Sequence, residues 1–264
     1  MLDFSSYAAV VFDMDGVLYR GKQRLAGVVE LLRFLDERSI TYICATNNST
    51  LTPEQYQAKL AVMDIVMPAT RVMTSSVVTR RYLEQQAARG ARVGYIGMEG
   101  LRVALFEDGY FLNDQVAPDY YVVGMNFEVT YADFRVACKA IRARSIFIGT
   151  NPDTTFPAED GIVPGTGSLL ALLSAASETT PFVIGKPQPA MFQAAIQVLG
   201  VSPERTLTIG DRLDTDIAGA INAGLASALV LTGVTNVAAL EASAIKPDAV
   251  FADLPALLAA WRQA

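Results

Sequence analysis

Histidine is missing from all 264 residues of the chain. Its absence removes the commonest general base, the serine–histidine and cysteine–histidine nucleophile pairs, and histidine-ligated zinc. Any chemistry must therefore use carboxylates, lysines, hydroxyls, backbone amides and metal ions bound through oxygen.

Cysteine and long apolar runs are also scarce. Cys44 and Cys138, both in apolar surroundings, do not make a disulfide framework, so we interpret them as structural thiols. The longest uncharged stretch, 222–240, is interrupted by Gly, Ser, Thr and Asn, which is not typical of a membrane span. The opening MLDFSS has an acid where a secretory signal would be basic, and no apolar core follows it. We expect a cytoplasmic protein that does not bind membranes.

Clustered positive charge is lacking too. The formal net charge is −6 and no block of Lys and Arg stands out, so we expect no nucleic-acid polymer as a partner. The hydrophobic fraction of 52% and the charged fraction of 18% are ordinary for a globular chain with a well-buried core.

Short β-branched runs alternate with amphipathic helical patterns along the whole chain. This alternation predicts βαβ units and an α/β fold with a parallel sheet. It begins again near residue 91, which favours a second, smaller α/β unit inserted into the first. The expected strands are 9–15, 41–47, 71–76, 91–97, 120–126, 145–151, 181–185, 206–211, 226–233 and 248–254.

Two acids close the first expected strand, in AVVFDMDGVL. Asp13 and Asp15 can line one crevice where the chain turns, and Gly16 permits a tight turn. Taken alone, the pair is equally compatible with a solvated acidic turn. The spacing does not fit an EF-hand loop.

Two further segments offer groups that suit phosphate. Thr46, Asn47 and Asn48 in CATNNST supply a hydroxyl, amides and backbone N–H groups, although the same residues are good turn and N-cap residues. Lys186 in IGKPQPAMF could neutralise a nucleophile and a phosphate together, although most lysines are simply exposed.

A fourth segment, TIGDRLDTD, carries Asp211, Asp214 and Asp216 within a few residues. Several hard oxygens in a small space favour Mg²⁺, although acids in a first helical turn are also stabilised by the helix dipole. The four segments each close an expected strand, and the carboxyl ends of a parallel sheet are where α/β proteins bind ligands. Together they would supply a nucleophile, a second acid, phosphate donors, a cation and metal ligands.

These segments, DMDGVL, ATNN, GKP and GDRLDTD, resemble the four motifs of the haloacid dehalogenase superfamily and stand in the same order. TNPDTTFP, 150–157, resembles a cap segment of the NagD-like (class IIA) phosphatases, with Thr150 where many relatives have a small residue. The resemblance implies a Rossmann-like core of residues 1–82 and 181–264, with a type II α/β cap, 83–180, inserted between the second and third motifs.

The resemblance also implies a mechanism. Asp13 would attack phosphorus to form an aspartyl-phosphate, and Asp15 would protonate the leaving oxygen and then activate water. Mg²⁺ would be bound by the Asp13 side chain, the Asp15 carbonyl and Asp211. Thr46, Asn47 and Asn48 would hold phosphate oxygens, with Lys186 between the nucleophile and the phosphate. Asp216 would support a metal-bound water, and the sequence leaves open whether Asp214 takes part.

Asn151, Asp153 and Phe156 in the expected cap are candidates for contact with the leaving group, and a simple Asx turn is the alternative. The implied activity is Mg²⁺-dependent hydrolysis of a small phosphomonoester: a sugar phosphate, nucleoside monophosphate, glycerol phosphate or aryl phosphate. The family also makes a homodimer through the cap a possible assembly.

Three other activities would use some of the same residues. A dehalogenase would not need Asp15. A phosphomutase or other phosphotransferase of the same superfamily shares the acids and stays open. A catalytically silent metal- or phosphate-binding module would be expected to have at least one broken motif, and all four are intact.

Overall fold

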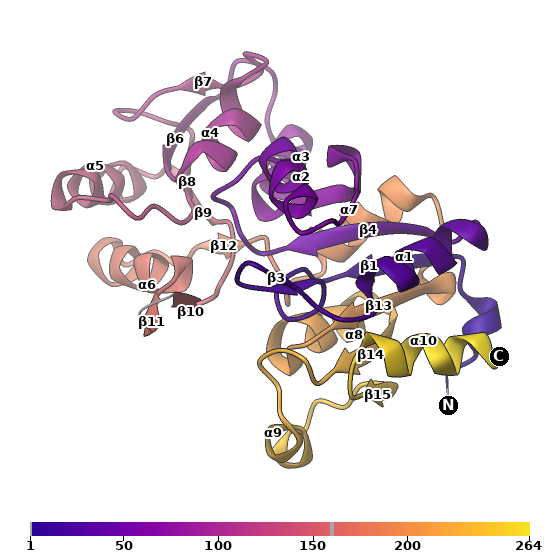
Figure 1. The fold of residues 1–264 in the computed structure, drawn as a ribbon. Helices are drawn as coiled ribbons and strands as arrows, with labels where there is room; N and C mark the ends of the chain where they lie inside the picture. The colour runs from indigo at the N-terminus through magenta and orange to yellow at the C-terminus, as the bar shows by residue number, and fades with distance from the viewer. Residues whose placement is uncertain (1, 159–160) are drawn as a thin grey trace. The chain divides into compact units, whose positions relative to one another are not determined.

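A computed structural model describes residues 2–158 and 161–264. The chain forms two compact units, each built from separate stretches of sequence (Figure 1). The first unit comprises Met1–Thr46, Glu54–Met73 and Lys186–Ala264, and the second comprises Asn47–Pro53 and Thr74–Gly185.

The first unit is organised around a sheet which, within the described residues, has six strands in the order β15–β14–β13–β1–β4–β5. β1 (Ala9–Phe12) pairs in parallel with β13 (Thr206–Gly210) on one side and β4 (Thr41–Thr46) on the other. These strands are buried because helices cover both faces, as a parallel sheet requires. The α/β prediction with a central parallel sheet is confirmed.

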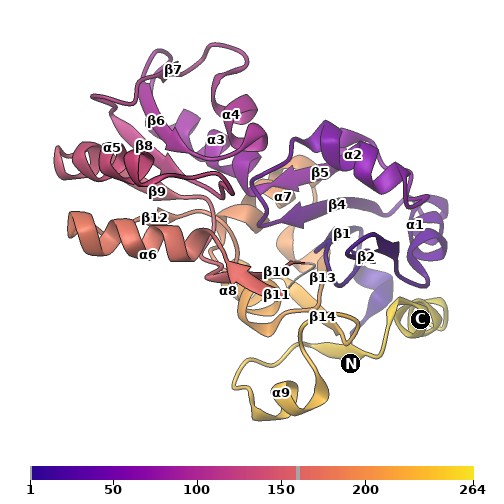
Figure 2. The same cartoon turned by 60° about the vertical axis from the view of Figure 1, so that its left-hand side comes forward.

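Four helices make the two covering layers of this sheet. α1 (Val28–Glu37) packs beside α10 (Leu254–Arg262) on one face, and α7 (Ala190–Leu199) packs beside α8 (Ala218–Ala223) on the other (Figures 1 and 2). The remaining elements of this unit are β2 (Tyr19–Arg20), β3 (Gln23–Arg24), α2 (Pro53–Ala61), β5 (Val72–Thr74), β14 (Ala226–Val230), α9 (Val237–Ala242), β15 (Ala249–Phe251), a π-helical turn at Leu213–Ile217 and 3-10 turns at Phe4–Ser6, Ala69–Arg71 and Pro203–Arg205.

The second unit has its own parallel sheet, ordered β12–β9–β8–β6–β7 among the residues described. Helices α5 (Tyr131–Arg142) and α6 (Thr166–Ser177) pack together over this sheet, and Thr130 begins α5 with a capping box. The other elements are α3 (Ser75–Gln86), β6 (Arg92–Ile96), α4 (Glu99–Phe106), β7 (Leu112–Asn113), β8 (Tyr120–Val123), β9 (Ile146–Gly149), the hairpin of β10 (Thr155–Ala158) and β11 (Gly161–Pro164), and β12 (Phe182–Val183).

The unit boundaries differ from those expected at residues 82 and 180. β12 falls within the stretch expected in the core, yet it pairs with β9, where Phe182 is opposite Ile148. Helix α3 also joins the second unit, because it packs on α4 and its Tyr82 ring stacks on Phe182 at 4.9 Å. The hydrophobic periodicity of the sequence does not reveal contacts of this kind, because they join segments that are distant in the chain.

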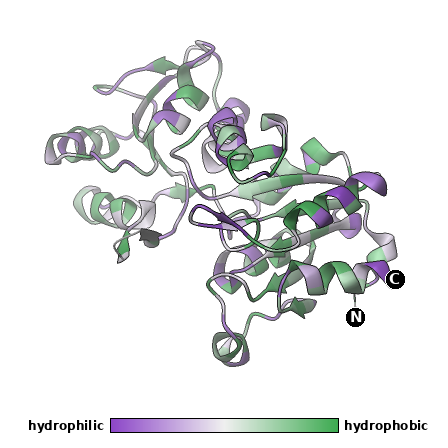
Figure 3. Cartoon of the chain, viewed as in Figure 1, coloured by the Kyte–Doolittle hydropathy of each residue, from purple (hydrophilic) through white to green (hydrophobic). Residues whose placement is uncertain are grey.

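Hydrophobic residues run through the strands of both sheets, and polar residues gather on outward turns of the helices (Figure 3). Both cysteines are free: Cys44 is buried and Cys138 is half-buried. In the part of the chain that the structure describes, no helix combines the length and apolar character needed to cross a membrane.

Candidate functional site

Three neighbouring strands of the first unit deliver polar residues to one edge of the sheet. Asp13 directly follows β1, Thr46 ends β4, and Asp211 directly follows β13. Because the strands are parallel and adjacent, their carboxyl ends meet at the same edge, which is where open α/β sheets bind ligands.

Lys186 is the buried cation of this edge, with only 3% of its surface exposed. Its Nζ lies 2.5 Å from Asp13 Oδ1 and 2.7 Å from Asp216 Oδ1, and it donates to the Ala45 carbonyl at 3.0 Å. Burial opposes the charged form, but attraction to the two acids outweighs it and raises the pKa of the Lys186 ammonium. Lys186 therefore stays charged and bridges the ends of two strands.

Asp216 stabilises the turn that follows β13. Its Oδ2 accepts hydrogen bonds from the backbone N–H groups of Asp211, at 3.2 Å, and Arg212, at 3.0 Å, while its Oδ1 accepts from Lys186. The carboxylate is therefore already used by protein donors on both oxygens. These contacts position Asp211 and Lys186.

Asp211 is held by a loop that the sequence analysis did not single out. The backbone N–H of Val234 donates to Asp211 Oδ2 at 2.6 Å, and that of Thr235 donates to the Asp211 carbonyl at 3.2 Å. Gly233 permits this approach, since a methyl group there would overlap the Asp211 carboxylate. The only sequence signal was the Thr-Gly turn after an apolar strand.

The other oxygen of Asp211, Oδ1, is unsatisfied in the described part of the chain. Within residues 2–158 and 161–264 nothing donates to Asp211 Oδ1, although the atom is buried. Buried acceptors are normally satisfied, so an orphaned carboxylate oxygen calls for an explanation such as a bound ion. Oxygen atoms of Asp13, Asp211 and Asp216 all lie within 4.8 Å of one another.

Burial and the close approach of these acids raise the pKa of two of them. Burial, together with the neighbouring carboxylates Asp211 and Asp216, raises the pKa of Asp13 well above its usual range, despite the attraction of Lys186. Burial and the nearby Asp216 raise the pKa of Asp211 to about 7. One lysine does not balance three carboxylates, and hard oxygen ligands suit Mg²⁺, so the residues present fit that ion.

Asp15 lies on the solvent-exposed side of this edge. Removal of water by surrounding atoms raises the pKa of its carboxyl group, while Lys59 and Arg20 partly offset the rise. Tyr56, from the same helix as Lys59, shares a side-chain hydrogen bond with Thr46. Tyr56 and Lys59 were not predicted from the sequence, although their spacing of three on α2 puts them on one helix face.

Asp214 lies apart from the acid cluster. Its two carboxylate oxygens accept from the Arg212 guanidinium at 3.0 and 2.7 Å, and 67% of its side chain is exposed. This ion pair lowers the pKa of Asp214. The residue that the sequence left open is thus paired with arginine at the surface.

The remaining predicted residues belong to the second unit. Asp153 Oδ2 accepts from the side-chain amides of both Asn47 and Asn151, each at 2.9 Å, and Thr150 donates to Asn151 Oδ1 at 2.9 Å. Asn48 Oδ1 accepts from the backbone and hydroxyl of Thr50, which is turn chemistry. The structure thus groups Asn151 and Asp153 with Asn47.

Phe156 is placed elsewhere in the second unit. Its ring lies 5.7 Å from that of Phe127.

Comparison with known proteins supplies the family. The model described as haloacid dehalogenase-like hydrolase matches residues 10–111, and a second, described as HAD-hydrolase-like, matches 183–257. A 5′-nucleotidase of Bacillus subtilis, YutF, is 40% identical over 87% of this chain and 89% of its own. The structure of 4-nitrophenylphosphatase from Thermotoga maritima is similar with a TM-score of 0.93 and 34% identity, covering 97% of this chain and 98% of that one.

A third relative has been crystallised with a metal ion. The structure of a glycerol phosphate phosphatase from Mycobacterium tuberculosis, in complex with magnesium, is similar with a TM-score of 0.88 and 31% identity over 96% of this chain and 77% of that one. Identities of this size over almost the full length show common descent as well as a common fold. The chain belongs to the haloacid dehalogenase-like hydrolases and, within them, to the NagD-like phosphatases.

Proposed function

We propose that this phosphatase hydrolyses small phosphomonoesters with Mg²⁺ and with Asp13 as a covalent nucleophile. The observation that carries the proposal is the arrangement after β1 and β13, where Lys186 contacts Asp13 and the buried Asp211 Oδ1 has no partner among the residues that the structure describes. An anionic nucleophile repels an anionic phosphate. A fixed cation and a bound metal ion beside the nucleophile would offset this repulsion.

The first half-reaction transfers the phosphoryl group to the protein. A carboxylate oxygen of Asp13 forms a bond to phosphorus while the ester P–O bond breaks, and Asp15 gives its proton to the departing oxygen. The raised pKa of the Asp15 carboxyl supports this role, because a carboxyl group that holds its proton more firmly is better suited to act as a general acid. Lys186 stays protonated and keeps Asp13 in place.

The second half-reaction restores the enzyme. Asp15, now ionised, accepts a proton from a water molecule while the oxygen of that water forms a bond to phosphorus. The bond between phosphorus and Asp13 breaks, and inorganic phosphate is released. One carboxyl group thus acts first as acid and then as base, which suits a chain without histidine.

We assign the Mg²⁺ ligands to the Asp13 carboxylate, the Asp15 carbonyl and Asp211, with Asp216 holding the Asp211 turn. When bound, the ion would screen the repulsion between the nucleophile and the phosphate. The crowding of Asp13, Asp211 and Asp216 supports the assignment, as does the magnesium in the Mycobacterium tuberculosis relative.

Phosphate oxygens are assigned to Thr46, Lys186 and Asn47. Tyr56 orients the Thr46 hydroxyl, and Asp153 orients the Asn47 amide. Both are positioning residues. The side chain of Asn48 accepts hydrogen bonds from Thr50 within its own turn, so we assign its phosphate contact to the backbone.

We propose that the first unit is the catalytic core and that the second unit selects the leaving group, with Phe156 as one contact. The named relatives act on nucleotides, nitrophenyl phosphate and glycerol phosphate, which supports a small phosphomonoester as substrate. A cytoplasmic address and a homodimer through the second unit remain expectations from the sequence. Analytical ultracentrifugation tests the dimer.

Phosphate release from a panel of phosphomonoesters, with Mg²⁺ or with EDTA, tests the proposed function. The panel holds nucleoside monophosphates, sugar phosphates, glycerol phosphate and 4-nitrophenyl phosphate. Release that requires Mg²⁺ supports the proposal. Formation of an isomeric phosphate ester without release of inorganic phosphate would instead identify a phosphomutase.

Asp211→Asn is expected to weaken Mg²⁺ strongly, whereas Asp214→Asn serves as its matched control. Asp211 offers the free oxygen, while Asp214 is neutralised by Arg212. We expect the Mg²⁺ concentration for half-maximal activity to rise about 10–100-fold in Asp211→Asn, as for the loss of a strong charged contact, and to change less than about twofold in Asp214→Asn. A larger effect at Asp214 than at Asp211 would refute the ligand assignment.

Asp153→Ala is expected to lower kcat/KM about tenfold by releasing Asn47. The change removes two hydrogen bonds to one carboxylate oxygen, each made by a side-chain amide. Steady-state kinetics on the best substrate measure the effect. Glu107→Gln, which removes an exposed carboxylate of the same unit, should leave kcat/KM unchanged. Wild-type kinetics in Asp153→Ala would show that this contact does not position Asn47.

A further inference from the structure

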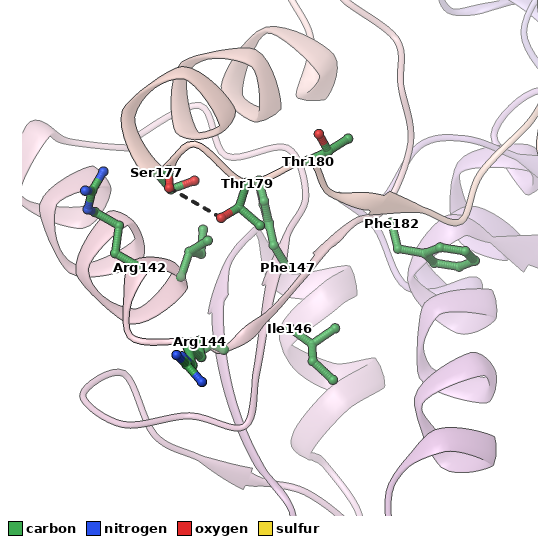
Figure 4. Close-up of a pocket in the computed structure, with 10 residues that line it drawn as sticks. Arg142, Arg144, Ile146, Phe147, Ser177, Thr179, Thr180 and Phe182 are labelled. Atoms are coloured by element: carbon green, nitrogen blue, oxygen red, sulfur yellow. Dashed lines mark hydrogen bonds between the residues drawn. The ribbon is translucent and has the colours of Figure 1, made fainter.

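A cavity of about 490 Å³ lies within the second unit, between the last turns of α5 and α6 (Figure 4). It is bordered by Ile146 and Phe182, the first residues of the parallel strands β9 and β12. Thr150, Asn151 and Asp153 follow the carboxyl end of β9, so the cavity belongs to the opposite edge of this sheet. Its size is typical of a small-molecule site.

Two arginines line the cavity, and the charge of one of them is not paired with any carboxylate that the structure describes. Arg142 donates to the Ala176 carbonyl at 3.1 Å and lies 3.5 Å from Glu178. The guanidinium group of Arg144 has no hydrogen bond or ion pair with any residue that the structure describes. An unpaired guanidinium in a protein of net charge −6 makes a local positive site that attracts anions.

The backbone conformation of Arg144 also supports a ligand-binding role for its side chain. Arg144 has φ +81°, a left-handed conformation, at the end of α5, where its N–H donates to Ile141 and the next N–H donates to Ala140. Glycine is preferred at this position of a helix end, and α7 and α8 do end on Gly200 and Gly224 in that conformation. An arginine here is strained, and strained residues cluster at ligand sites.

Ser177 supplies a hydroxyl group without a partner. The residue is 5% exposed, it lines the cavity, and none of the described residues accepts from or donates to its buried Oγ. The neighbouring Thr179 hydroxyl donates to the Ser177 carbonyl at 3.3 Å, so it does not satisfy the Ser177 hydroxyl (Figure 4). A ligand with an acceptor oxygen would do so.

The other side of the cavity is apolar. Ile146 and Phe182 are 52% and 51% exposed, and the Phe182 ring is held by its stack on Tyr82, at 18° between the planes. Aromatic and aliphatic surface next to a few convergent polar groups is the usual composition of a ligand pocket.

We propose that this cavity is a second ligand site, separate from the catalytic edge, which binds a small organic anion. Arg144 and the Ser177 hydroxyl hold its carboxylate or phosphate group, and Ile146 and Phe182 contact a flat apolar body.

Titration with benzoate, followed by amide resonances in two-dimensional NMR of the full-length deuterated protein, tests the proposal. Saturable shifts are expected at the amides of Ser145, Ile146 and Ser177–Thr179. Benzamide, which has the same shape without the charge, should bind about tenfold or more weakly, because a charge-assisted contact is lost. Absence of saturable shifts at these amides, or equal binding of the two compounds, would overturn the proposal.

Arg144→Gly separates binding from folding. Glycine relieves the left-handed backbone, so the melting temperature should stay the same or rise, while benzoate affinity falls about tenfold or more. Arg135→Ala, an exposed arginine on the same helix but outside the cavity, should bind benzoate like the wild type. An unchanged affinity in Arg144→Gly, or the same loss in Arg135→Ala, would refute the role of Arg144.

Discussion

Asp13→Asn is expected to abolish phosphate release from every substrate of the panel. Asparagine keeps the size and most contacts of aspartate, but its neutral amide is a poor nucleophile and a poor Mg²⁺ ligand. Loss of a catalytic nucleophile lowers turnover by about six orders of magnitude in other covalent enzymes, and uncatalysed phosphomonoester hydrolysis is among the slowest reactions known. Steady-state assays with saturating Mg²⁺ should therefore find no turnover above background.

The control for this variant is Asp214→Asn, which makes the same change at an exposed, arginine-paired acid of the same unit. It should retain nearly all activity. Near-ultraviolet circular dichroism should be unchanged in both variants, because asparagine has the size of aspartate and Lys186 keeps Asp216 as its ion-pair partner in Asp13→Asn. Substantial activity in Asp13→Asn would mean that another group attacks phosphorus.

Lys186→Met is expected to destabilise the first unit by about 3–5 kcal/mol, the usual result of removing one partner of a buried ion pair. Lys186 is the cation between Asp13 and Asp216, and both contacts are short. Its removal leaves two buried carboxylates without a counter-charge. The chain's single tryptophan, Trp261, is buried in α10 of this unit, so urea unfolding followed by its fluorescence reports the loss.

Two further variants distinguish the loss of the Lys186 ion pairs from the general effect of replacing a lysine by methionine. Lys246→Met removes an exposed lysine whose ammonium contacts carbonyl groups at the end of α9, and it should change stability by less than about 1 kcal/mol. Adding Asp216→Asn to Lys186→Met should recover part of the lost stability, because one unpaired charge is removed. A loss below about 1 kcal/mol in Lys186→Met would contradict the view that this lysine holds the acids together.

Much of the fold could be predicted because local pattern and tertiary structure agree. β1, β4 and β13 are apolar runs that end at polar residues, and α7 ends at Gly200, as the composition of each segment indicates. The α/β class was predicted from this pattern, whereas the family and the phosphatase activity were predicted from the resemblance of the four motifs, and all three are confirmed. The roles of the individual site residues stay predictions.

Other features depend on contacts between distant segments and left little trace in the sequence. The edge strand β12 is only two residues long, and its pairing with β9 decides which unit it joins. Val234 contacts Asp211 through its backbone N–H, so its side chain carries no signal. Asp153 accepts a hydrogen bond from Asn47 across about one hundred residues of sequence, and the sequence did not indicate this contact. The expected contact of Asn151 and Asp153 with the leaving group stays a prediction.

Trapping of the covalent intermediate tests the central claim most directly. The enzyme would be mixed with its best substrate and Mg²⁺, quenched in acid during turnover, and reduced with borohydride, which converts an aspartyl-phosphate to homoserine. Peptide mass spectrometry should then find homoserine at position 13, in the wild type but not in Asp13→Asn. Homoserine at another acid, or none at position 13 in an enzyme caught during turnover, would contradict the account.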